Sequence, residues 1–179
     1  MTVIKTHQSI KIMPKKLIIK MARNGKGIFA AKAFKQGEII ETISGKLVHH
    51  ERASKLWDEN ARKAENLFRY CGTRYLSPEG ELGDYSNHSC NPNSGVIKNK
   101  GKLFWIAIND IKRGQETLID YSTIIGADDA WTMKCNCGEK ECRKIIRSID
   151  KLPKKILDRY LKLGIIPRYI LNTMKKARP

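Results

Sequence analysis

Three cysteines lie close together near the end of the chain, in the stretch CNCGEKEC. Cys135, Cys137 and Cys142 follow a Cys-x-Cys-x4-Cys spacing, and their neighbours are Lys, Asn and Glu rather than apolar residues. Zinc in structural sites takes four Cys or His ligands in a tetrahedron. The spacing therefore predicts three ligands of a zinc site. From the residues alone, several side chains are candidates for the fourth ligand: Cys90, Cys71, His49 and His50.

A second group of polar side chains fills the stretch GDYSNHSCNPNS, residues 83–94. A His and a Cys can form a nucleophilic dyad. However, His88 and Cys90 lie almost next to each other in a turn, where we do not expect them to face one another, and no third orienting group follows. The Asn and Pro residues instead predict tight turns that are capped by side chains. By these arguments the stretch is a stiff polar loop.

Two further motifs have more than one interpretation. The stretch GQETLIDYS places Glu116 and Asp120 around an apolar pair and ends at Tyr121. Taken alone, a tyrosine that closes a strand is a core residue with a hydrogen-bonded hydroxyl. The run Gly25-Lys26-Gly27 is weak evidence for a dinucleotide site, because no strand–GxGxxG–helix context surrounds it.

The elements that must position these residues are short strands, followed by helices. Gly and Asn turns punctuate the apolar runs, and an NKGK turn between two runs predicts a hairpin. Near the end, Pro153 suits a first helical turn and Gly164 a C-terminal cap. The lack of βαβ alternation argues against a Rossmann-type sheet. Strands are expected at 18–20, 27–31, 38–48, 66–77, 95–99 and 102–110, and helices at 49–64, 150–164 and 166–177.

Charge is unevenly distributed along the 179 residues. The net charge is +17, and residues 134–179 carry 14 Lys and Arg against 4 Asp and Glu. Such a field favours nucleic acid, ribosomes or acidic proteins as partners, although a solvated surface is the alternative interpretation. No apolar run approaches the roughly 18 residues of a membrane span, and no signal peptide is recognised. We therefore expect a cytoplasmic or nuclear protein without membrane contact, with secretion as an effector left open.

Taken in this order, the motifs resemble those of the SET-domain protein-lysine methyltransferases. GKG is similar to the first Gly-x-Gly of that family, and YSNHSCNPN to its Arg-Phe-x-Asn-His-Ser-Cys-x-Pro-Asn signature. GQETLIDYS is similar to Gly-Glu-Glu-Leu-Thr-Phe-Asp-Tyr, and CNCGEKECRK to the post-SET Cys-x-Cys-x4-Cys motif. The resemblance covers roughly residues 17–146.

The resemblance implies a fold that is mainly β with some α. This fold is a β-clip or SET-type arrangement of several small sheets with pseudoknot-like threading, followed by a zinc-binding post-SET loop and C-terminal helices. The implied division is an N-terminal extension (1–16), a SET catalytic domain (17–124), a post-SET zinc motif (130–147) and a basic helical segment (148–179).

The resemblance also implies an activity, which is methyl transfer from S-adenosylmethionine to a lysine of a protein substrate, chromatin-associated (a histone-like protein) or ribosomal. Tyr121 would be the catalytic tyrosine, and Cys90 the fourth ligand of a structural zinc. The implied cofactor-binding residues are Gly25, Lys26, Gly27, Tyr75, Tyr85, Asn87 and His88. Trp131 either folds over the cofactor or is a core aromatic. The basic C-terminal segment is a candidate for contact with nucleic acid or a ribosome. The alternative is an inactive, zinc-containing protein that binds nucleic acid or chromatin.

Two departures from the family pattern carry expectations of their own. Ile119 occupies a position where the family often has Phe or Tyr, and a smaller side chain there leaves room for a di- or trimethylated lysine. Lys144 stands where a Gly usually follows Cys-Arg, so we expect the chain to turn differently after the zinc site.

Overall fold

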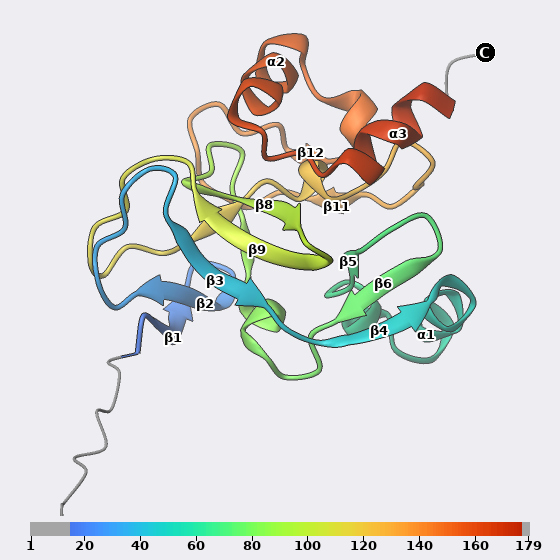
Figure 1. Cartoon of the computed structure of the whole chain (residues 1–179), viewed down its shortest axis with the longest axis horizontal. Helices are drawn as coiled ribbons and strands as arrows, with labels where there is room; N and C mark the ends of the chain where they lie inside the picture. Colours follow the sequence, from blue (N-terminus) through green and yellow to red (C-terminus); the bar gives the residue numbers. More distant parts are fainter. Residues whose placement is uncertain (1–14, 177–179) are drawn as a thin grey trace, which may run out of the picture.

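Strands in the computed structural model, which describes residues 15–176, form several small sheets rather than one large sheet (Figure 1). A three-stranded sheet with the order β3-β9-β8 lies beside a second one with the order β4-β6-β5, and the other sheets are pairs. The strands are β1 (Leu17–Ala22), β2 (Gly25–Ala30), β3 (Ile39–Ile43), β4 (Lys46–His49), β5 (Phe68–Arg69), β6 (Arg74–Ser77), β7 (Asn87–His88), β8 (Ser94–Asn99), β9 (Lys102–Ala107), β10 (Leu118–Ile119), β11 (Met133–Lys134) and β12 (Ile145–Ile146). The helices are α1 (His50–Ala64), α2 (Lys154–Leu163) and α3 (Arg168–Lys176), with 3₁₀ turns η1 (Leu82–Tyr85), η2 (Tyr121–Thr123) and η3 (Ile149–Lys151).

The hairpin β8–β9 confirms the prediction from the NKGK turn. Its strands pair antiparallel with Ser94 opposite Ala107, and both turn residues, Lys100 and Gly101, have positive φ, as a two-residue hairpin turn requires. Alternate residues of β9 point into the main core, where Leu103 and Trp105 are each about 1% exposed. This hairpin therefore contributes fully buried side chains to the main core.

Two expected strands were wrong in their extent. Residues 66–77 form the antiparallel pair β5 and β6 rather than one strand. Residues 38–48 form two strands, β3 and β4, which belong to different sheets. The chain turns between them at Gly45, which has a φ of +156°. A Cβ at Gly45 would lie 2.2 Å from the carbonyl oxygen of Ser77, so the turn requires glycine.

The polar stretch 83–94 is fastened to the segment that leads to Tyr121. Strand β7 pairs with β10 in parallel, with Asn87 opposite Leu118. The Asn93 side chain forms hydrogen bonds with the backbone of this segment, as a neighbouring strand would. Its Oδ1 accepts a hydrogen bond from the Leu118 amide at 2.9 Å, and its Nδ2 donates to the Glu116 carbonyl at 2.8 Å. The expected side-chain caps are present, and the partner of the stretch is this distant segment.

The predicted helices are present, and one of them has a feature that the sequence did not indicate. Helix α1 is interrupted at Asn60, which has non-helical angles. Helix α2 ends, as expected, at a left-handed Gly164. Helices α2 and α3 lie together on one side of the central sheet (Figure 1) around a second apolar core that contains Tyr160, Ile165 and Ile170. Within residues 15–176, no helix is long and apolar enough to span a bilayer.

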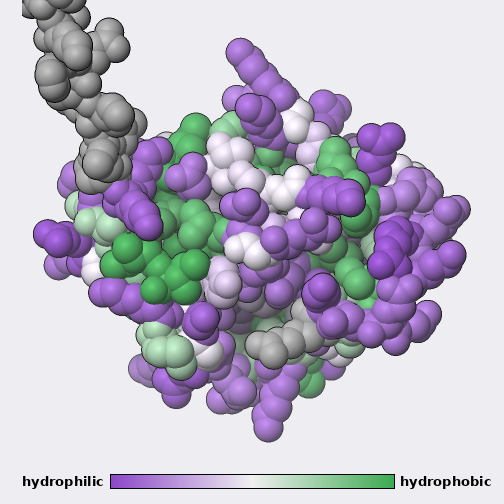
Figure 2. Space-filling model, turned by 90° about the horizontal axis from the view of Figure 1, so that it is seen from below, coloured by the Kyte–Doolittle hydropathy of each residue, from purple (hydrophilic) through white to green (hydrophobic). Residues whose placement is uncertain are grey.

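The surface agrees with the high charge of the chain. On the face shown in Figure 2, hydrophilic side chains predominate and the hydrophobic patches are separated by them. Of the expected N-terminal extension, residues 1–14 lie outside the described part of the chain. The division into the segments 17–124, 130–147 and 148–179 stays a prediction.

Candidate active site

A cleft of about 610 Å³ lies between α1, the β5–β6 hairpin and the segment that follows Tyr121. Aromatic side chains and carboxylates both contribute to its walls. The aromatic residues are Trp57, Phe68, Tyr75, Tyr121 and Trp131, and the acidic residues are Glu65, Asp128 and Asp129. In a chain with a net charge of +17, such a cleft suits a ligand with an apolar stem and a cationic end.

Tyr121 is held at this cleft through both its backbone and its hydroxyl. Its amide donates to Nδ1 of His88 at 3.2 Å, and its hydroxyl donates to the Ser86 carbonyl oxygen at 2.5 Å. Burial and the carboxylates of Glu116 and Glu65 raise the pKa of Tyr121. The hydroxyl therefore stays protonated at neutral pH and can act as a hydrogen-bond donor and acceptor.

Most of the predicted cofactor residues gather in one place, next to the cleft. Nδ2 of Asn87 donates to the Lys26 carbonyl at 3.1 Å and to Oε1 of Glu116 at 2.7 Å. The Lys26 ammonium lies 5.9 Å from the centre of the Tyr85 ring. A Cβ at Gly27 would lie 2.1 Å from Oε1 of Glu116 and 2.8 Å from Nδ2 of Asn87, so a larger residue there would displace these two side chains.

Three other predicted residues lie elsewhere. Tyr75 and Trp131 line the cleft together with Tyr121, and the rings of Tyr121 and Trp131 are 6.5 Å apart. Ile119 is about 1% exposed in the main core and does not belong to the cleft wall. Tyr75 and Trp131 are thus grouped with the candidate catalytic tyrosine, whereas Gly25, Lys26, Gly27, Tyr85 and Asn87 are not part of the cleft lining.

Three of the four predicted zinc ligands converge, and one histidine joins them. His88, Cys90, Cys135 and Cys137 offer ligand atoms that all lie within 4.8 Å of one another. Cys142, the remaining predicted ligand, is not one of these four, and its Sγ lies 3.9 Å from the carbonyl oxygen of Cys135. The other candidates, Cys71, His49 and His50, lie outside this group, although His49 and His50 form a small exposed cluster with Glu51.

The thiols differ in acidity within the cluster. Burial would raise the pKa of Cys137, but the backbone amides of Cys90 and Glu139 and the neighbouring thiols lower it to about 7. Burial raises the pKa of Cys135. Backbone amides also approach two sulfurs at 3.4 Å, from Arg143 to Cys90 and from Lys144 to Cys142. Amide donors directed at sulfur suit thiolates, the form of cysteine that binds zinc.

His88 and Cys90 do face one another, contrary to our expectation. Nε2 of His88 lies 3.3 Å from Sγ of Cys90, and Asp120 is 3.6 Å from Nδ1 on the other side. Because Nδ1 accepts from the Tyr121 amide, the neutral ring carries its proton on Nε2 and donates it to sulfur. Burial lowers the pKa of His88 to about 4, although the negative charge of Asp120 acts in the other direction and raises this pKa.

This trio of Cys, His and Asp is not arranged as a nucleophilic triad. Burial raises the pKa of the Cys90 thiol, whereas a nucleophilic cysteine needs a lowered one. None of the three side chains lines the cleft. Their place beside Cys135 and Cys137 instead favours a role in holding a metal.

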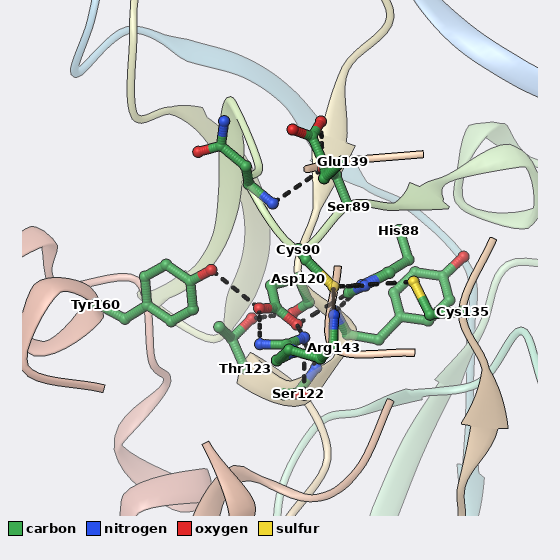
Figure 3. Close-up of polar contacts among 12 residues, drawn as sticks. His88, Ser89, Cys90, Asp120, Ser122, Thr123, Cys135, Glu139, Arg143 and Tyr160 are labelled. Atoms are coloured by element: carbon green, nitrogen blue, oxygen red, sulfur yellow. Dashed lines mark hydrogen bonds and ion pairs between the residues drawn. The ribbon is translucent and has the colours of Figure 1, made fainter. Parts of the chain in front are cut away.

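The sequence did not reveal the partners of Asp120, which is about 1% exposed. Its carboxylate accepts two hydrogen bonds from Arg143, at 2.7 and 2.6 Å, and a third from the hydroxyl of Tyr160 at 2.9 Å. Figure 3 shows Asp120 between Tyr160 on one side and His88 and Cys90 on the other. Its place directly before Tyr121 was the only signal available in the sequence.

A second pair missed by sequence reasoning borders the cleft. Arg69 is 7% exposed and binds both carboxylate oxygens of Asp128. The carbonyl of Arg69 in turn accepts a hydrogen bond from the hydroxyl of Tyr169 in α3. These partners are 59 and 100 residues apart in sequence, so no local pattern joins them.

Residues 25–122 match the family model of the SET domain. Histone-lysine N-methyltransferase ASHH3 of Arabidopsis thaliana is 28% identical over 170 residues, which are 89% of this chain and 45% of the relative. Histone-lysine N-methyltransferase 2B of Homo sapiens is 28% identical over 138 residues, 72% of this chain and 5% of the relative. The chain thus spans less than half the length of these curated relatives.

Solved structures agree on the fold. A structure of ctPRC2 bound to S-adenosylmethionine has a TM-score of 0.53 and 23% identity, and covers 62% of this chain and 15% of that one. An inhibitor-bound, humanized Polycomb Repressive Complex 2 of Chaetomium thermophilum has a TM-score of 0.54 and 22% identity, with the same coverage. The expected fold of small sheets with a few helices is confirmed.

Proposed function

The chain belongs to the SET domain family, and from that premise we propose that it is an S-adenosylmethionine-dependent protein-lysine N-methyltransferase. One observation carries the proposal. The Tyr121 hydroxyl, bonded to the Ser86 carbonyl, lines a partly aromatic cleft, and Asn87 next to Ser86 reaches the backbone of Lys26. A site for a lysine side chain and a site for a cofactor would then share the segment 85–88.

The residues at the predicted cofactor site fit such a ligand. S-adenosylmethionine, when bound, supplies a methyl group that its sulfonium has already activated. The chain there offers a backbone with no room for a Cβ at Gly27 and an Asn87 amide fixed by Glu116. We propose that Gly25, Lys26, Gly27, Tyr85, Asn87 and His88 hold the cofactor. Tyr75 and Trp131, which line the cleft, would form the wall between cofactor and substrate.

The cleft residues can bind and orient a lysine. Its ammonium has a reference pKa of about 10.4 and must lose a proton before it can react. Burial around the Tyr121 hydroxyl, which raises the pKa of Tyr121 itself, disfavours the charged amine at the reacting position, whereas the carboxylates of the cleft lining attract the cationic side chains of a substrate. The Tyr121 hydroxyl, kept protonated by its raised pKa, can accept the amine's hydrogen bond while it remains bonded to Ser86, and so fix the direction of attack.

The acidic residues of the cleft bear on the choice of substrate. Glu65, Asp128 and Asp129 stand in its lining, and the relatives are named histone-lysine methyltransferases. We therefore propose a basic, histone-like protein as substrate. Ile119 is a buried member of the main core, against which Tyr121 packs, so any effect of its small side chain on the number of methyl groups must act through this packing.

We further propose a structural zinc ion bound by Cys90, Cys135, Cys137 and Cys142. Three of these cysteines lie in one tight group, and the Cys142 sulfur lies 3.9 Å from the carbonyl oxygen of Cys135, next to that group. His88 would be an outer partner, because its Nε2–H points at the Cys90 sulfur while its Nδ1 is occupied by the Tyr121 amide. The zinc would hold the loop 133–146 against the cleft and take no part in methyl transfer.

A second candidate function rests on the outer face of α2. Lys154, Lys155, Arg159 and Lys162 are all exposed there, and the sole acidic residue of the helix, Asp158, is bonded to Lys154 at 2.7 Å. This face suits the phosphates of nucleic acid, whether on the enzyme or on an inactive binding protein. Affinity for DNA or RNA that falls steeply with salt would support it.

Methyl transfer from labelled S-adenosylmethionine to a lysine-rich histone-like protein tests the leading proposal. We expect methyllysine by mass spectrometry with the native chain, and loss of calorimetric cofactor binding with Asn87→Ala. Asn99→Ala, at the exposed end of β8, is the matched control and should behave like the native chain. Salt-sensitive nucleic-acid binding without any cofactor binding would contradict the enzyme and favour the inactive binder.

A further inference from the structure

Each of the two C-terminal helices places one buried hydroxyl against a segment that borders the cleft. Tyr160 of α2 is 0% exposed, and its hydroxyl donates to Oδ2 of Asp120 at 2.9 Å. Thr173 of α3 is 5% exposed, and its oxygen accepts the Ala127 amide at 2.8 Å while donating to the Ile170 carbonyl. Neither helix belongs to the part of the chain that matches the SET domain model.

The contact of Tyr160 reaches the backbone of the candidate catalytic tyrosine. Oδ1 of Asp120 accepts the Ser122 amide at 3.0 Å, and the Asp120 carbonyl accepts the side chain of Thr123 at 2.7 Å. Asp120 therefore caps the short turn η2, which begins at Tyr121. A buried carboxylate needs its hydrogen bonds, and those to a charged group are the strong ones. Tyr160 points at this carboxylate from the side of α2 (Figure 3).

The contact of Thr173 reaches the other wall of the cleft. Residues 124–131 carry six of its lining side chains: Ile124, Ile125, Asp128, Asp129, Ala130 and Trp131. The Ala127 amide, in the middle of this segment, has Thr173 as its partner. Gly126 beside it is packed so closely that a Cβ would lie 3.0 Å from Thr173 and 2.2 Å from Arg69. Helix α3 thus holds residues 124–131, which form this wall of the cleft, in position.

We propose that α2 and α3 are positioning elements of the methyl-transfer site, with Tyr160 acting through Asp120 on Tyr121 and Thr173 acting through residues 124–131 on the cleft wall. This inference rests on the proposed function and adds residues that none of the sequence motifs contains. Neither hydroxyl is needed to dock the helices, because apolar residues such as Ile165 and Ile170 form that interface. The hydrogen bonds of the two hydroxyls therefore serve to position Asp120 and residues 124–131 rather than to dock the helices.

Tyr160→Phe and Thr173→Val remove these hydroxyls with little change in volume. We expect Tyr160→Phe to lower kcat roughly tenfold with little change in KM, since a small displacement of a catalytic group has large effects on rate. Thr173→Val should raise KM for the protein substrate about fivefold, because it loosens a wall that binds substrate. Tyr70→Phe is the matched control: its hydroxyl bonds the Gly101 carbonyl at the tip of the β8–β9 hairpin, and its kinetics should equal those of the native chain.

Hydrogen exchange supplies a readout that does not depend on activity. Both variants should speed exchange of the amides between residues 120 and 131 and leave those of the β8–β9 hairpin unchanged. A lower melting temperature with native kinetics and native exchange in this segment would overturn the inference. A native chain that transfers no methyl group would instead overturn the proposed function, and the exchange data would still decide whether the two hydroxyls hold the segment.

Discussion

The chain beyond Tyr121 is attached to the SET domain in two different ways. The loop 133–146 packs through a cluster whose buried members are Cys90, Cys135 and Ile146. The C-terminal helices pack through a larger apolar cluster, with Ile108, Ile149, Leu152, Tyr160, Ile165, Ile166 and Ile170 as its buried members. Both attachments meet at Asp120, which binds Arg143 from the loop and Tyr160 from the helix.

The difference concerns the source of stability. A fully buried Ile or Leu contributes roughly 1.5–3 kcal/mol, so the helices can dock by apolar burial alone. The loop has one buried isoleucine and a group of thiols among polar neighbours, and such loops depend on metal binding. We therefore expect the loop to need zinc and the helices to keep their place without it.

The largest expected effect comes from Cys90→Ser. Losing a structural zinc removes binding free energy on the order of 10 kcal/mol, so bound zinc, measured by atomic emission, should fall to near zero. Cofactor affinity should fall as well, because Cys90 follows Asn87 and His88 by three and two positions. Cys71→Ser, outside the cluster, should keep both properties. A Cys90→Ser chain that retains zinc and cofactor would disprove the joint role of this segment.

Ile170→Ala should have the next largest effect, and on the other attachment. Ile170 is 0% exposed, and removing such a side chain costs about 2–5 kcal/mol of unfolding free energy. Denaturant titration should show this loss while zinc content stays at the native level. The control is Leu161→Ala in α2, where the side chain is 46% exposed. If Ile170→Ala lost zinc under conditions in which the native chain retains it, the two attachments would not be independent.

Lys144→Gly should have the smallest effect and the opposite sign. Lys144 has a φ of +65°, a conformation that costs a non-glycine residue about 1 kcal/mol. The chain therefore has a glycine-type conformation at a lysine, and the expected difference in the turn after the zinc site stays a prediction. Glycine should raise the stability of the loop by about that amount, whereas Lys134→Gly, in strand β11, should lower it. Equal effects of the two changes in thermal melts would refute this strain.

Sequence was sufficient for the elements whose signals are local. The NKGK turn identified the β8–β9 hairpin, Gly164 identified the end of α2, and the spacing of the cysteines identified Cys135 and Cys137, two members of the cluster. Strands β7 and β10 have only two residues each, too few for any periodicity. Their pairing, which brings His88 beside Tyr121, therefore could not be predicted from the residues without the family resemblance.

Sequence was insufficient for contacts between distant polar residues. Asp120, Arg143 and Tyr160 come from a strand end, a cysteine loop and a helix, and no spacing relates them. His88 and Cys90 were not expected to face one another, because a turn considered alone does not show that Asp120 and Tyr121 pack against it. The fold class and the motif residues were thus predictable, whereas the hydrogen-bonded frame around Tyr121 was not.

The most direct test of the account is single-turnover methyl transfer by the native chain and by Tyr121→Phe, with cofactor affinity measured by calorimetry. The account predicts that the variant binds S-adenosylmethionine as tightly as the native chain but transfers its methyl group at least about 100-fold more slowly, because one oriented hydroxyl is lost. Equal rates for the two chains would contradict the assignment of Tyr121 as the residue that orients the lysine.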